Sequence, residues 1–358
     1  MGNPLRNLNP QLYISIMSHQ TQPNLFSYAT SELSQDAFIC WLAAWADPIF
    51  GGFELHQIAR EFLLSLIHKH KTNYTLEKIQ TVTVLRQVEK LDILIEINKD
   101  NSYEKLAILI EDKTHTDHHS GQLGRYYDNA KKDYTVEQII PIYFKTGYQS
   151  KFDVGQYKTY LRKEFLELLQ VGKSTIKNAI YCDFLSHLEN MEYAVNQYSN
   201  TSLSDWSDND WRGFFMQIYN SREQFYTIGE DDRANWNYVA NPAGGFFGFW
   251  WYFKPLQNEL YTPYLQLENN SLCFKIEVND ETKRSMAREK AFQKLMAAAI
   301  QLNSIRVERP KRMGNGRYMT VMRWDGDYRQ KRNGLLDFQE TLENLKKAQE
   351  VLDKTFPQ

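Results

Sequence analysis

The sequence predicts an α/β fold, with a mixed sheet flanked by helices, followed by a second domain of the α+β type. Three observations predict it. Between residues 34 and 144, apolar residues follow helical and then strand spacing, in the order helix, three strands, helix, strand. A polar segment rich in Asp and Ser, Ser199–Asp210, then interrupts this pattern. Aromatic strands and long helices follow. At 358 residues, the chain is longer than one ordinary core and suits two domains.

Helical spacing comes first in the predicted N-terminal domain. Residues 1–23 carry several Pro and Asn and are expected to form an irregular arm. A helix begins near Ser34 and stops at Asp47-Pro48, because Ser caps helix N-termini and Pro ends helices. Gly51-Gly52 breaks the chain, and a second helix, roughly Glu54–His70, follows.

Strand spacing then replaces helical spacing, which gives a mixed sheet flanked by helices over residues 24–198. One of these strands, a continuous apolar run, ends abruptly in Glu-Asp-Lys. The expected elements are the strands Ile79–Val88, Leu91–Ile97, Leu106–Ile110 and Gln138–Phe144, the helix Gln122–Lys132, and helical structure from Gln156 to about Asn196.

A second domain is predicted over residues 211–358. Gly314-Asn-Gly316 within it predicts a hairpin turn. The expected elements are the strands Phe246–Phe253, Tyr264–Leu267, Leu272–Val278, Ile305–Glu308 and Arg317–Trp324, and the helices Glu281–Leu302 and Leu335–Phe356.

The composition predicts a soluble, cytoplasmic protein. Hydrophobic residues make up 42% of the chain and charged residues 24%, close to globular averages. The three cysteines lie far apart, so we expect no disulfide framework. We find no signal segment, and no apolar run approaches the ~20 residues of a membrane helix. The net charge of −2 means that any nucleic-acid-binding surface has to be local.

Two of the predicted strands carry groups that suit phosphodiester hydrolysis. Side chains alternate along a strand, so Glu111 and Lys113 share a face while Asp112 points away. Asp92 lies at the start of the preceding strand. Neighbouring strands can therefore present Asp92, Glu111 and Lys113 toward one point.

Carboxylates and an ammonium at one point could serve metal-assisted catalysis. Two carboxylates can hold Mg²⁺ or Mn²⁺, which would polarise a phosphate and lower the pKa of a bound water. Lys113 could position or deprotonate that water, or bind the phosphate. The alternative interpretation is a pair of solvated strand ends with an incidental ion pair, because these residue types are common.

The pattern resembles the PD-(D/E)XK nuclease superfamily. The resemblance is carried by Asp92, by Glu111-Asp-Lys113, and by the helix Gln122-xxx-Tyr126, whose Gln and Tyr share one face. The αβββαβ order is similar to the restriction-endonuclease-like core of that superfamily. The segment that begins Asn24-Leu-Phe-Ser, together with Glu111-Asp-Lys-Thr-His, is similar to an uncharacterised bacterial group of PD-(D/E)XK proteins. The resemblance covers residues 24–190 and does not explain the second domain.

This resemblance implies a Mg²⁺- or Mn²⁺-dependent nuclease acting on DNA. Asp92 and Glu111 would bind the metal, Lys113 would act on the water or the phosphate, and Gln122 would orient Lys113 or the nucleophile. Leu91 stands where the superfamily often has proline.

The resemblance also implies an acid from the first helix. Glu32, Asp36 and Glu61 are candidates, and Asp36 is favoured because it lies in the Ser-Gln-Asp-Ala-Phe stretch that carries the narrower resemblance.

Two further groups of residues are candidates for substrate binding. Tyr126 and His115 could line the active site, since His115 follows Lys113 by two residues on the same side. His118 and His119 match no common metal-ligand spacing and are more typical of a solvated loop. Basic residues near the predicted hairpin could grip phosphates, or they could form a solvated face. They include Arg309, Lys311, Arg312 and Arg317.

The function that fits these observations best is a Mg²⁺-dependent deoxyribonuclease, an endonuclease in defence or DNA processing, with nucleic acid as partner and a homo-oligomer as an open alternative. The rival hypothesis is a catalytically silent module that keeps the nuclease fold to bind nucleic acid or protein. The complete Asp, Glu and Lys set favours the enzyme, because a decayed site tends to lose it.

Overall fold

The computed structural model describes residues 23–29, 31–114, 121–227, 229, 232–241, 244–256 and 260–357. The chain divides into two compact units. The first contains the chain up to Tyr148 together with Asp153–Asn190, and the second contains Gln149–Phe152 and Met191–Gln358. The predicted N-terminal arm lies outside the described residues except for Pro23.

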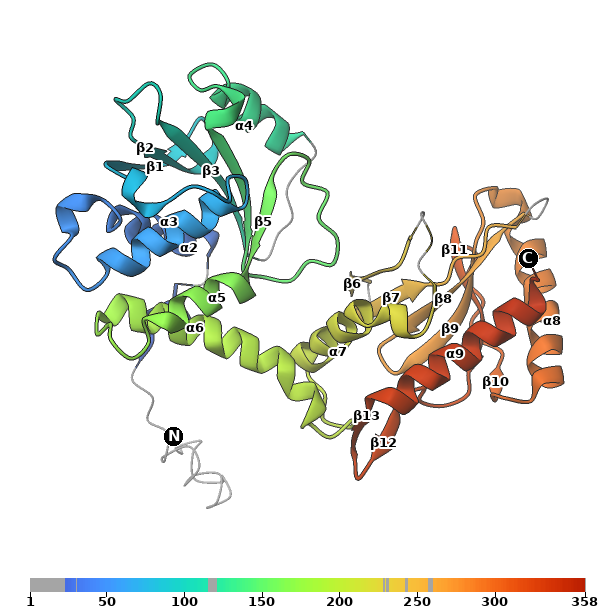
Figure 1. The fold of residues 1–358 in the computed structure, drawn as a ribbon. Coiled ribbons are helices and arrows are strands. Elements are labelled where there is room, and N and C mark those ends of the chain that lie inside the picture. Colours follow the sequence, from blue (N-terminus) through green and yellow to red (C-terminus); the bar gives the residue numbers. More distant parts are fainter. Residues whose placement is uncertain are drawn as a thin grey trace, which may run out of the picture. The chain divides into compact units, whose positions relative to one another are not determined.

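The first unit is built on a five-stranded mixed sheet in the order β1-β2-β3-β4-β5 (Figure 1). The pairs β1/β2 and β2/β3 are antiparallel, whereas β3/β4 and β4/β5 are parallel. The predicted α/β class with a mixed sheet is thereby confirmed. The strands are β1 Val82–Val88, β2 Leu91–Ile97, β3 Leu106–Lys113, β4 Ile139–Lys145 and β5 Lys158–Leu161.

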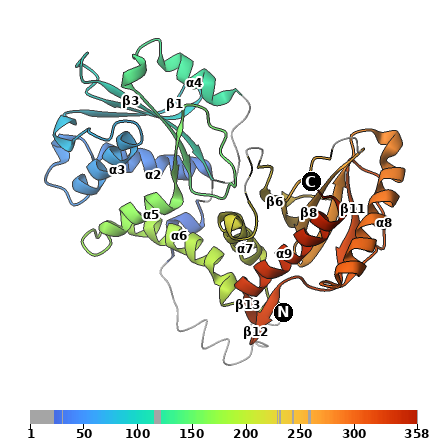
Figure 2. The ribbon, with the colours of Figure 1, turned by 45° about the vertical axis from the view of Figure 1, so that its right-hand side comes forward.

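Helices cover both faces of this sheet (Figures 1 and 2). Gln35 of α2 donates a hydrogen bond to Asp112 of β3, and Gln122 of α4 donates one to Glu111, the preceding residue of the same strand. Since successive side chains of a strand point to opposite faces, α2 and α4 lie on opposite sides of β3. The helices are α2 Glu32–Ala44, α3 His56–His68, α4 Gln122–Ala130, α5 Arg162–Val171 and α6 Ala179–Asn196.

An aromatic cluster joins α2 to the later helices. The rings of Phe38 in α2 and Phe184 in α6 are stacked 3.7 Å apart, and Phe165 of α5 packs against both. The prediction of uninterrupted helical structure from Gln156 was wrong, because residues 158–161 extend the sheet as β5 before α5 begins. Its short length and half-polar sequence gave little strand signal.

All eight residues of β3 are buried. The strand has a partner on each side and a helix on each face, so its core positions are apolar without alternation. Its last three residues, Glu111, Asp112 and Lys113, are buried although they are ionisable. Burying such groups is costly unless they are paired, so the end of β3 needs a polar network around it.

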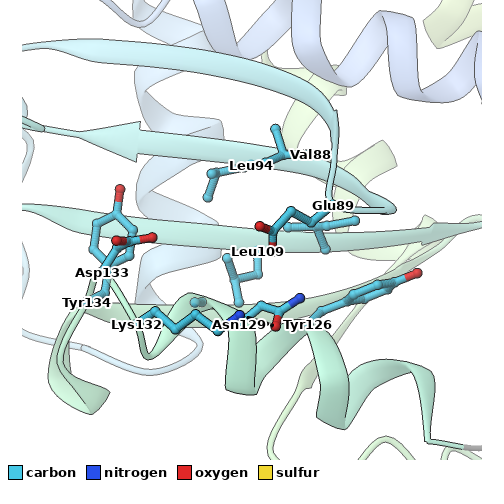
Figure 3. A pocket seen from close by; sticks show the side chains of 11 residues that line it. Val88, Glu89, Leu94, Leu109, Tyr126, Asn129, Lys132, Asp133 and Tyr134 are labelled. Atoms are coloured by element: carbon cyan, nitrogen blue, oxygen red, sulfur yellow. Dashed lines mark hydrogen bonds between the residues drawn. The ribbon is translucent and has the colours of Figure 1, made fainter.

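The β1–β2 turn is strained. Val88 pairs with Leu91, so the turn consists of Glu89 and Lys90, whose φ angles are +50° and +74°. Such turns favour Asn-Gly, because positive φ is costly for other side chains. The turn borders a cavity of about 120 Å³ whose apolar lining includes Leu109 and the ring of Tyr126 (Figure 3).

The second unit contains a six-stranded antiparallel sheet in the order β10-β11-β9-β8-β7-β6. Helices pack on its apolar face, where Arg212 of α7 lies over the ring of Phe247 in β7. The strands are β6 Asn235–Val239, β7 Phe246–Trp251, β8 Thr262–Glu268, β9 Ser271–Glu277, β10 Val307–Glu308 and β11 Tyr318–Trp324. The helices are α7 Asp208–Asn220, α8 Arg284–Leu302 and α9 Phe338–Thr355, and a separate hairpin joins β12 Gln330–Arg332 to β13 Leu335–Asp337.

The structure corrects the sequence prediction at two places in this unit. Strand pairing between β10 and β11 stops at Glu308 and Arg323, so Gly314–Gly316 belongs to a longer loop instead of a tight turn. The last helix begins at Phe338, because Leu335–Asp337 pairs with β12. None of the helices in the described part of the chain combines the length and apolar character that a membrane crossing requires.

Replacing Glu89-Lys90 with Asn-Gly should raise the free energy of unfolding by about 1 kcal/mol, because both new residues adopt positive φ at lower cost. The chain holds a matched control in the β12–β13 turn, where Asn333 and Gly334 have φ angles of +55° and +84°. Replacing Gly334 with Ala should lower stability. Urea unfolding followed by circular dichroism measures both changes, and an unchanged or lower stability of the Asn-Gly variant would contradict the strain.

Candidate active site

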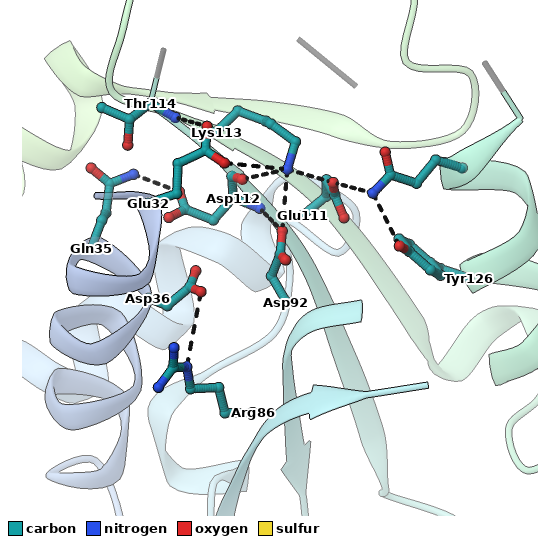
Figure 4. A network of polar contacts seen from close by, with 11 residues as sticks. Glu32, Gln35, Asp36, Arg86, Asp92, Glu111, Asp112, Lys113, Thr114 and Tyr126 are labelled. Atoms are coloured by element: carbon teal, nitrogen blue, oxygen red, sulfur yellow. Dashed lines mark hydrogen bonds and ion pairs between the residues drawn. The ribbon is translucent and has the colours of Figure 1, made fainter. Parts of the chain in front are cut away.

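The start of β2 and the end of β3 bring the three predicted residues to one point (Figure 4). The Nζ atom of Lys113 lies 2.7 Å from Oε1 of Glu111 and 3.5 Å from Oδ2 of Asp92. The backbone oxygen of Asp112 accepts a hydrogen bond from the same ammonium at 2.8 Å. One ammonium is therefore surrounded by three oxygen atoms from two strands.

Asp92 is held by the backbone of β3. Regular pairing of β2 with β3 ends at Ile93 and Ile110. Beyond it, Oδ2 of Asp92 accepts the backbone N–H of Asp112 at 2.9 Å. The carboxylate replaces the missing backbone acceptor and stays a quarter exposed, whereas Glu111 is fully buried. The site thus has one accessible and one enclosed carboxylate.

Helix α4 supplies the second contact to Glu111. Gln122 donates through Nε2 to Oε1 of Glu111 at 2.8 Å and to the hydroxyl of Tyr126 at 3.0 Å. Gln122 and Tyr126 are one helical turn apart on the same face, as their spacing predicted. Their contacts fix one oxygen of Glu111, while its other oxygen, Oε2, is buried without a hydrogen-bond partner among the described residues.

Of the three candidate acids from the helices, Glu32 lies nearest to Lys113. Its Oε2 is 3.9 Å from Nζ of Lys113, and its Oε1 accepts the backbone N–H of Thr114 at 3.0 Å. Asp36, the residue favoured from the sequence, is buried, and its Oδ2 lies 3.9 Å from Nε of Arg86. Glu61 is on α3, where it accepts a hydrogen bond from Gln57. Sequence alone could not separate Glu32 from Asp36, because both lie in the first turns of α2.

A second polar cluster lies on the α2 side of the sheet. Gln35 donates to Oδ1 of Asp112 at 2.5 Å, and Thr146 donates to the Gln35 carbonyl oxygen. Oδ2 of Asp112 and Oδ1 of Asp36 are buried without hydrogen-bond partners among the described residues. Gln35 was not among the site residues predicted from the sequence. The signal was an amide beside an acid on an otherwise apolar helix face.

None of the other predicted residues is among the described side chains around Lys113. His115, His118 and His119 are outside the described residues. The basic candidates all belong to the second unit: Arg309 pairs with Glu289 at 2.9 Å, Arg317 pairs with Glu277 at 2.6 Å, and Lys311 and Arg312 are exposed in the β10–β11 loop. Phosphate contact by these four residues stays a prediction.

The comparison with known families agrees with this geometry. The family model of the PD-(D/E)XK nuclease superfamily matches residues 24–227, more than half of the chain. The chain belongs to this superfamily. The match includes all five strands of the first unit and continues through α7. No curated protein and no solved structure matches the chain with significance.

This nuclease-superfamily site holds more acidic than basic side chains, since three carboxylates face Lys113. Burial raises the pKa of Glu111 to about 7, and the charge of Asp92 adds to the rise. Burial alone would lower the pKa of Lys113, but its hydrogen bond to Glu111 and the charges of Glu111, Asp92 and Glu32 raise it above its usual value. Lys113 is therefore a cation at neutral pH and is no general base in the metal-free protein.

On the other side of β3, burial is again the main effect. It raises the pKa of Asp36 to about 6, with Asp92 adding to the rise. Burial and the charge of Asp36 raise the pKa of Asp112 well above its usual value.

The donor set fits a divalent metal. Superfamily members typically use divalent metals. Within the described ranges, no three His, Cys, Asp or Glu side chains form a complete metal-ligand group. The oxygens around Lys113 nevertheless come from two carboxylates and one carbonyl, the donor types that Mg²⁺ prefers, and they already enclose a positive charge. Asp92, Glu111 and the Asp112 carbonyl would hold the metal once Lys113 moves aside.

Metal affinity should depend on pH through Glu111. Its raised pKa means that the carboxyl is protonated below about pH 7, and a proton competes with a metal for the same oxygens. Affinity for Mn²⁺ should therefore fall toward tenfold per unit as the pH drops below 7, and level off above it. Calorimetric titration at several pH values tests this. The Glu111→Gln variant is the control and should show weak binding with no such slope. Wild-type affinity that is flat between pH 5.5 and 8 would contradict the role of Glu111.

Proposed function

We propose that this chain is a divalent-metal-dependent deoxyribonuclease that hydrolyses phosphodiester bonds at the Asp92, Glu111 and Lys113 site. The observation that carries the proposal is the ammonium of Lys113 enclosed by oxygens of Asp92, Glu111 and Asp112. Membership of the nuclease superfamily supports the reaction class.

Each residue of the site would have a separate role in the reaction. A bound Mg²⁺ or Mn²⁺ would polarise the scissile phosphate and lower the pKa of the attacking water. Asp92 and Glu111 would bind that ion, and Gln122 would keep Oε1 of Glu111 in position through its hydrogen bond. Lys113, displaced from the carboxylates, would bind the phosphate or orient the water.

Glu32 is the acid that we propose from the first helix. It is the only one of the three candidates within ion-pair distance of Lys113. It also holds the backbone of Thr114, so it fixes the strand end that carries Lys113. Asp36 would instead keep the packing of α2 against Asp112, on the opposite face of β3.

The matched pair Asp92→Asn and Lys113→Met tests the catalytic set. Asp92→Asn should abolish both Mn²⁺ binding and cleavage, because it removes a ligand charge. Lys113→Met should lower the cleavage rate by about 10²- to 10³-fold while leaving metal binding intact, since it removes a cation that acts on the substrate phosphate. Cleavage of linear duplex and single-stranded DNA with Mg²⁺, Mn²⁺ or EDTA is the measurement. Full activity of Asp92→Asn would assign the cleavage to another protein, and a wild-type chain that binds Mn²⁺ and DNA but never cleaves would favour a silent binding module.

A second pair of variants separates the two acids of α2. Glu32→Gln should lower the cleavage rate by roughly tenfold or more, because Lys113 and Thr114 lose the group that positions them. Asp36→Asn should leave the rate near the wild-type value. It should also not destabilise the protein at pH 8, where the raised pKa of Asp36 means that its ionised form costs stability. Rate constants with thermal melts measure both. The reverse order of effects would restore Asp36 as the catalytic acid.

A further inference from the structure

One face of the second unit's sheet is polar and charged. Along β8, Tyr264, Gln266 and Glu268 alternate with apolar residues and therefore share this face. The register sets Thr262 of β8 opposite Glu277 of β9, and Glu277 opposite Tyr318 of β11. Residues directly opposite each other lie on the same face of a sheet, so Glu268, Glu277 and Tyr318 belong together.

Two glutamates on this face, the buried Glu277 and the half-buried Glu268, hold four cations. Glu277 accepts from Arg233 at 2.8 Å through one oxygen, and from Arg317 at 2.6 Å through the other. Burial would raise the pKa of Glu277, but these two hydrogen bonds hold it below its usual range. Glu268 forms the other two ion pairs, because its oxygens lie 3.0 Å from Lys275 and 3.4 Å from Arg323. We call these six residues the arginine face: Arg233, Glu268, Lys275, Glu277, Arg317 and Arg323.

The arginine face carries more positive than negative charge. Four cations surround two carboxylates. At the edge of the face, Arg306 adds one positive charge, and Glu308 and Asp325, which lies opposite Arg306, add two negative charges, so five cations stand against four carboxylates. The glutamate side chains are 8% and 15% exposed, whereas the side chains of Arg317, Arg233 and Arg323 are 52%, 37% and 37% exposed. The acids lie beneath the arginines, so the surface that a ligand meets is positive.

The fixed geometry of these arginines distinguishes them from ordinary surface cations. Each guanidinium is tied to a carboxylate from below, so it loses little conformational freedom when it binds an anion from above. Nε of Arg323 is buried and has no acceptor among the described residues. By comparison, Arg309 lies on the helix side, paired with Glu289 and stacked on Phe292 of α8.

Aromatic rings accompany the charges. Tyr318 is 52% exposed, and the guanidinium of Arg317 lies 5.3 Å from its ring. Phe253 stacks on Tyr264 at 4.6 Å, with Arg233 on Phe253 at 4.0 Å. Trp250 lies opposite Gln266 and is half-buried. An exposed ring between fixed guanidinium groups offers a base to stack on and anchors for the adjoining phosphates.

We propose that the arginine face binds single-stranded nucleic acid, with Arg233, Arg317 and Arg323 on phosphates and Tyr318 stacked on a base. The positive excess selects a polyanion, and the exposed ring selects one whose bases are unpaired. Naming this strand as the nuclease's substrate rests on the proposed function. The binding itself does not, because it needs neither metal nor cleavage.

The test is a binding titration of a fluorescein-labelled single-stranded DNA oligonucleotide in EDTA, at several salt concentrations. The variant Arg317→Gln/Arg323→Gln should bind at least tenfold more weakly. Its salt dependence should become shallower by ~0.7 in log–log slope for each phosphate that the variant no longer neutralises. Tyr318→Ala should weaken binding by roughly tenfold, whereas Tyr318→Phe, which keeps the ring, should not.

Matched controls separate a specific surface from general charge. Arg332→Gln/Lys346→Gln also removes two ion-paired cations, which are 81% and 36% exposed, and it should leave affinity unchanged. Arg317→Lys/Arg323→Lys should keep most of the affinity and confirms that the fold tolerates substitution there. Unchanged binding by the Gln variant, an equal loss in the control pair, or tenfold tighter binding of a duplex of the same length would overturn the proposal.

The same oligonucleotide distinguishes this surface from the nuclease site. Asp92→Asn should bind it as the wild-type protein does. Cleavage that needs Asp92 but is accompanied by arginine-independent binding would leave the proposed function standing and remove the arginine face. Arginine-dependent binding without any cleavage would do the reverse.

Discussion

The first unit depends on the enclosure of one ammonium, that of Lys113 at the end of β3, by the carboxylates of Glu111, Asp92 and Glu32. Glu111 and Lys113 are buried between two strands and two helices, where an unpaired charge would be prohibitively costly. Their mutual contact, with Asp92 and Glu32 nearby, lets an otherwise apolar strand end in three ionisable residues. Much of the surrounding polar structure serves these groups: the Asp92 bond to the β3 backbone, the Gln122 bond to Glu111, and the Glu32 bond to Thr114.

The charges in that arrangement are balanced only in part, and the excess of negative charge favours the binding of a metal ion. Three carboxylates face one lysine, and the pKa of Glu111 is raised in consequence of burial and of the charge of Asp92. A divalent cation would neutralise this excess better than a single ammonium, so metal binding and the release of Lys113 toward a substrate phosphate would be one linked event. In the metal-free protein, the main role of Lys113 is to neutralise the carboxylates around it.

The sequence predicted the mixed sheet and the convergence of Asp92, Glu111 and Lys113, because both follow from periodicity in long apolar strands. It also placed Gln122 and Tyr126 on one helical face. Among the candidate acids it favoured Asp36, and it did not predict the contact of Glu32 with Lys113, since a difference of one helical turn in a tertiary contact leaves no local pattern. Strand β5 was missed because four half-polar residues gave no period, and Gln35 because its partner Asp112 is distant in sequence. The outcome for His115 lies outside the described residues.

The two units use buried carboxylates in opposite ways. Around Lys113, acids outnumber cations, so the deficit is of positive charge and a metal ion would meet it. On the second unit's sheet, two glutamates hold four cations, so the deficit is of negative charge, and a phosphate backbone would meet it. The near-zero net charge of the chain, which excluded a globally basic protein, conceals this division, because local excesses of opposite sign offset each other in the total. The composition therefore gives only the total charge of the chain, whereas function depends on where each local excess of charge lies and which residues form it.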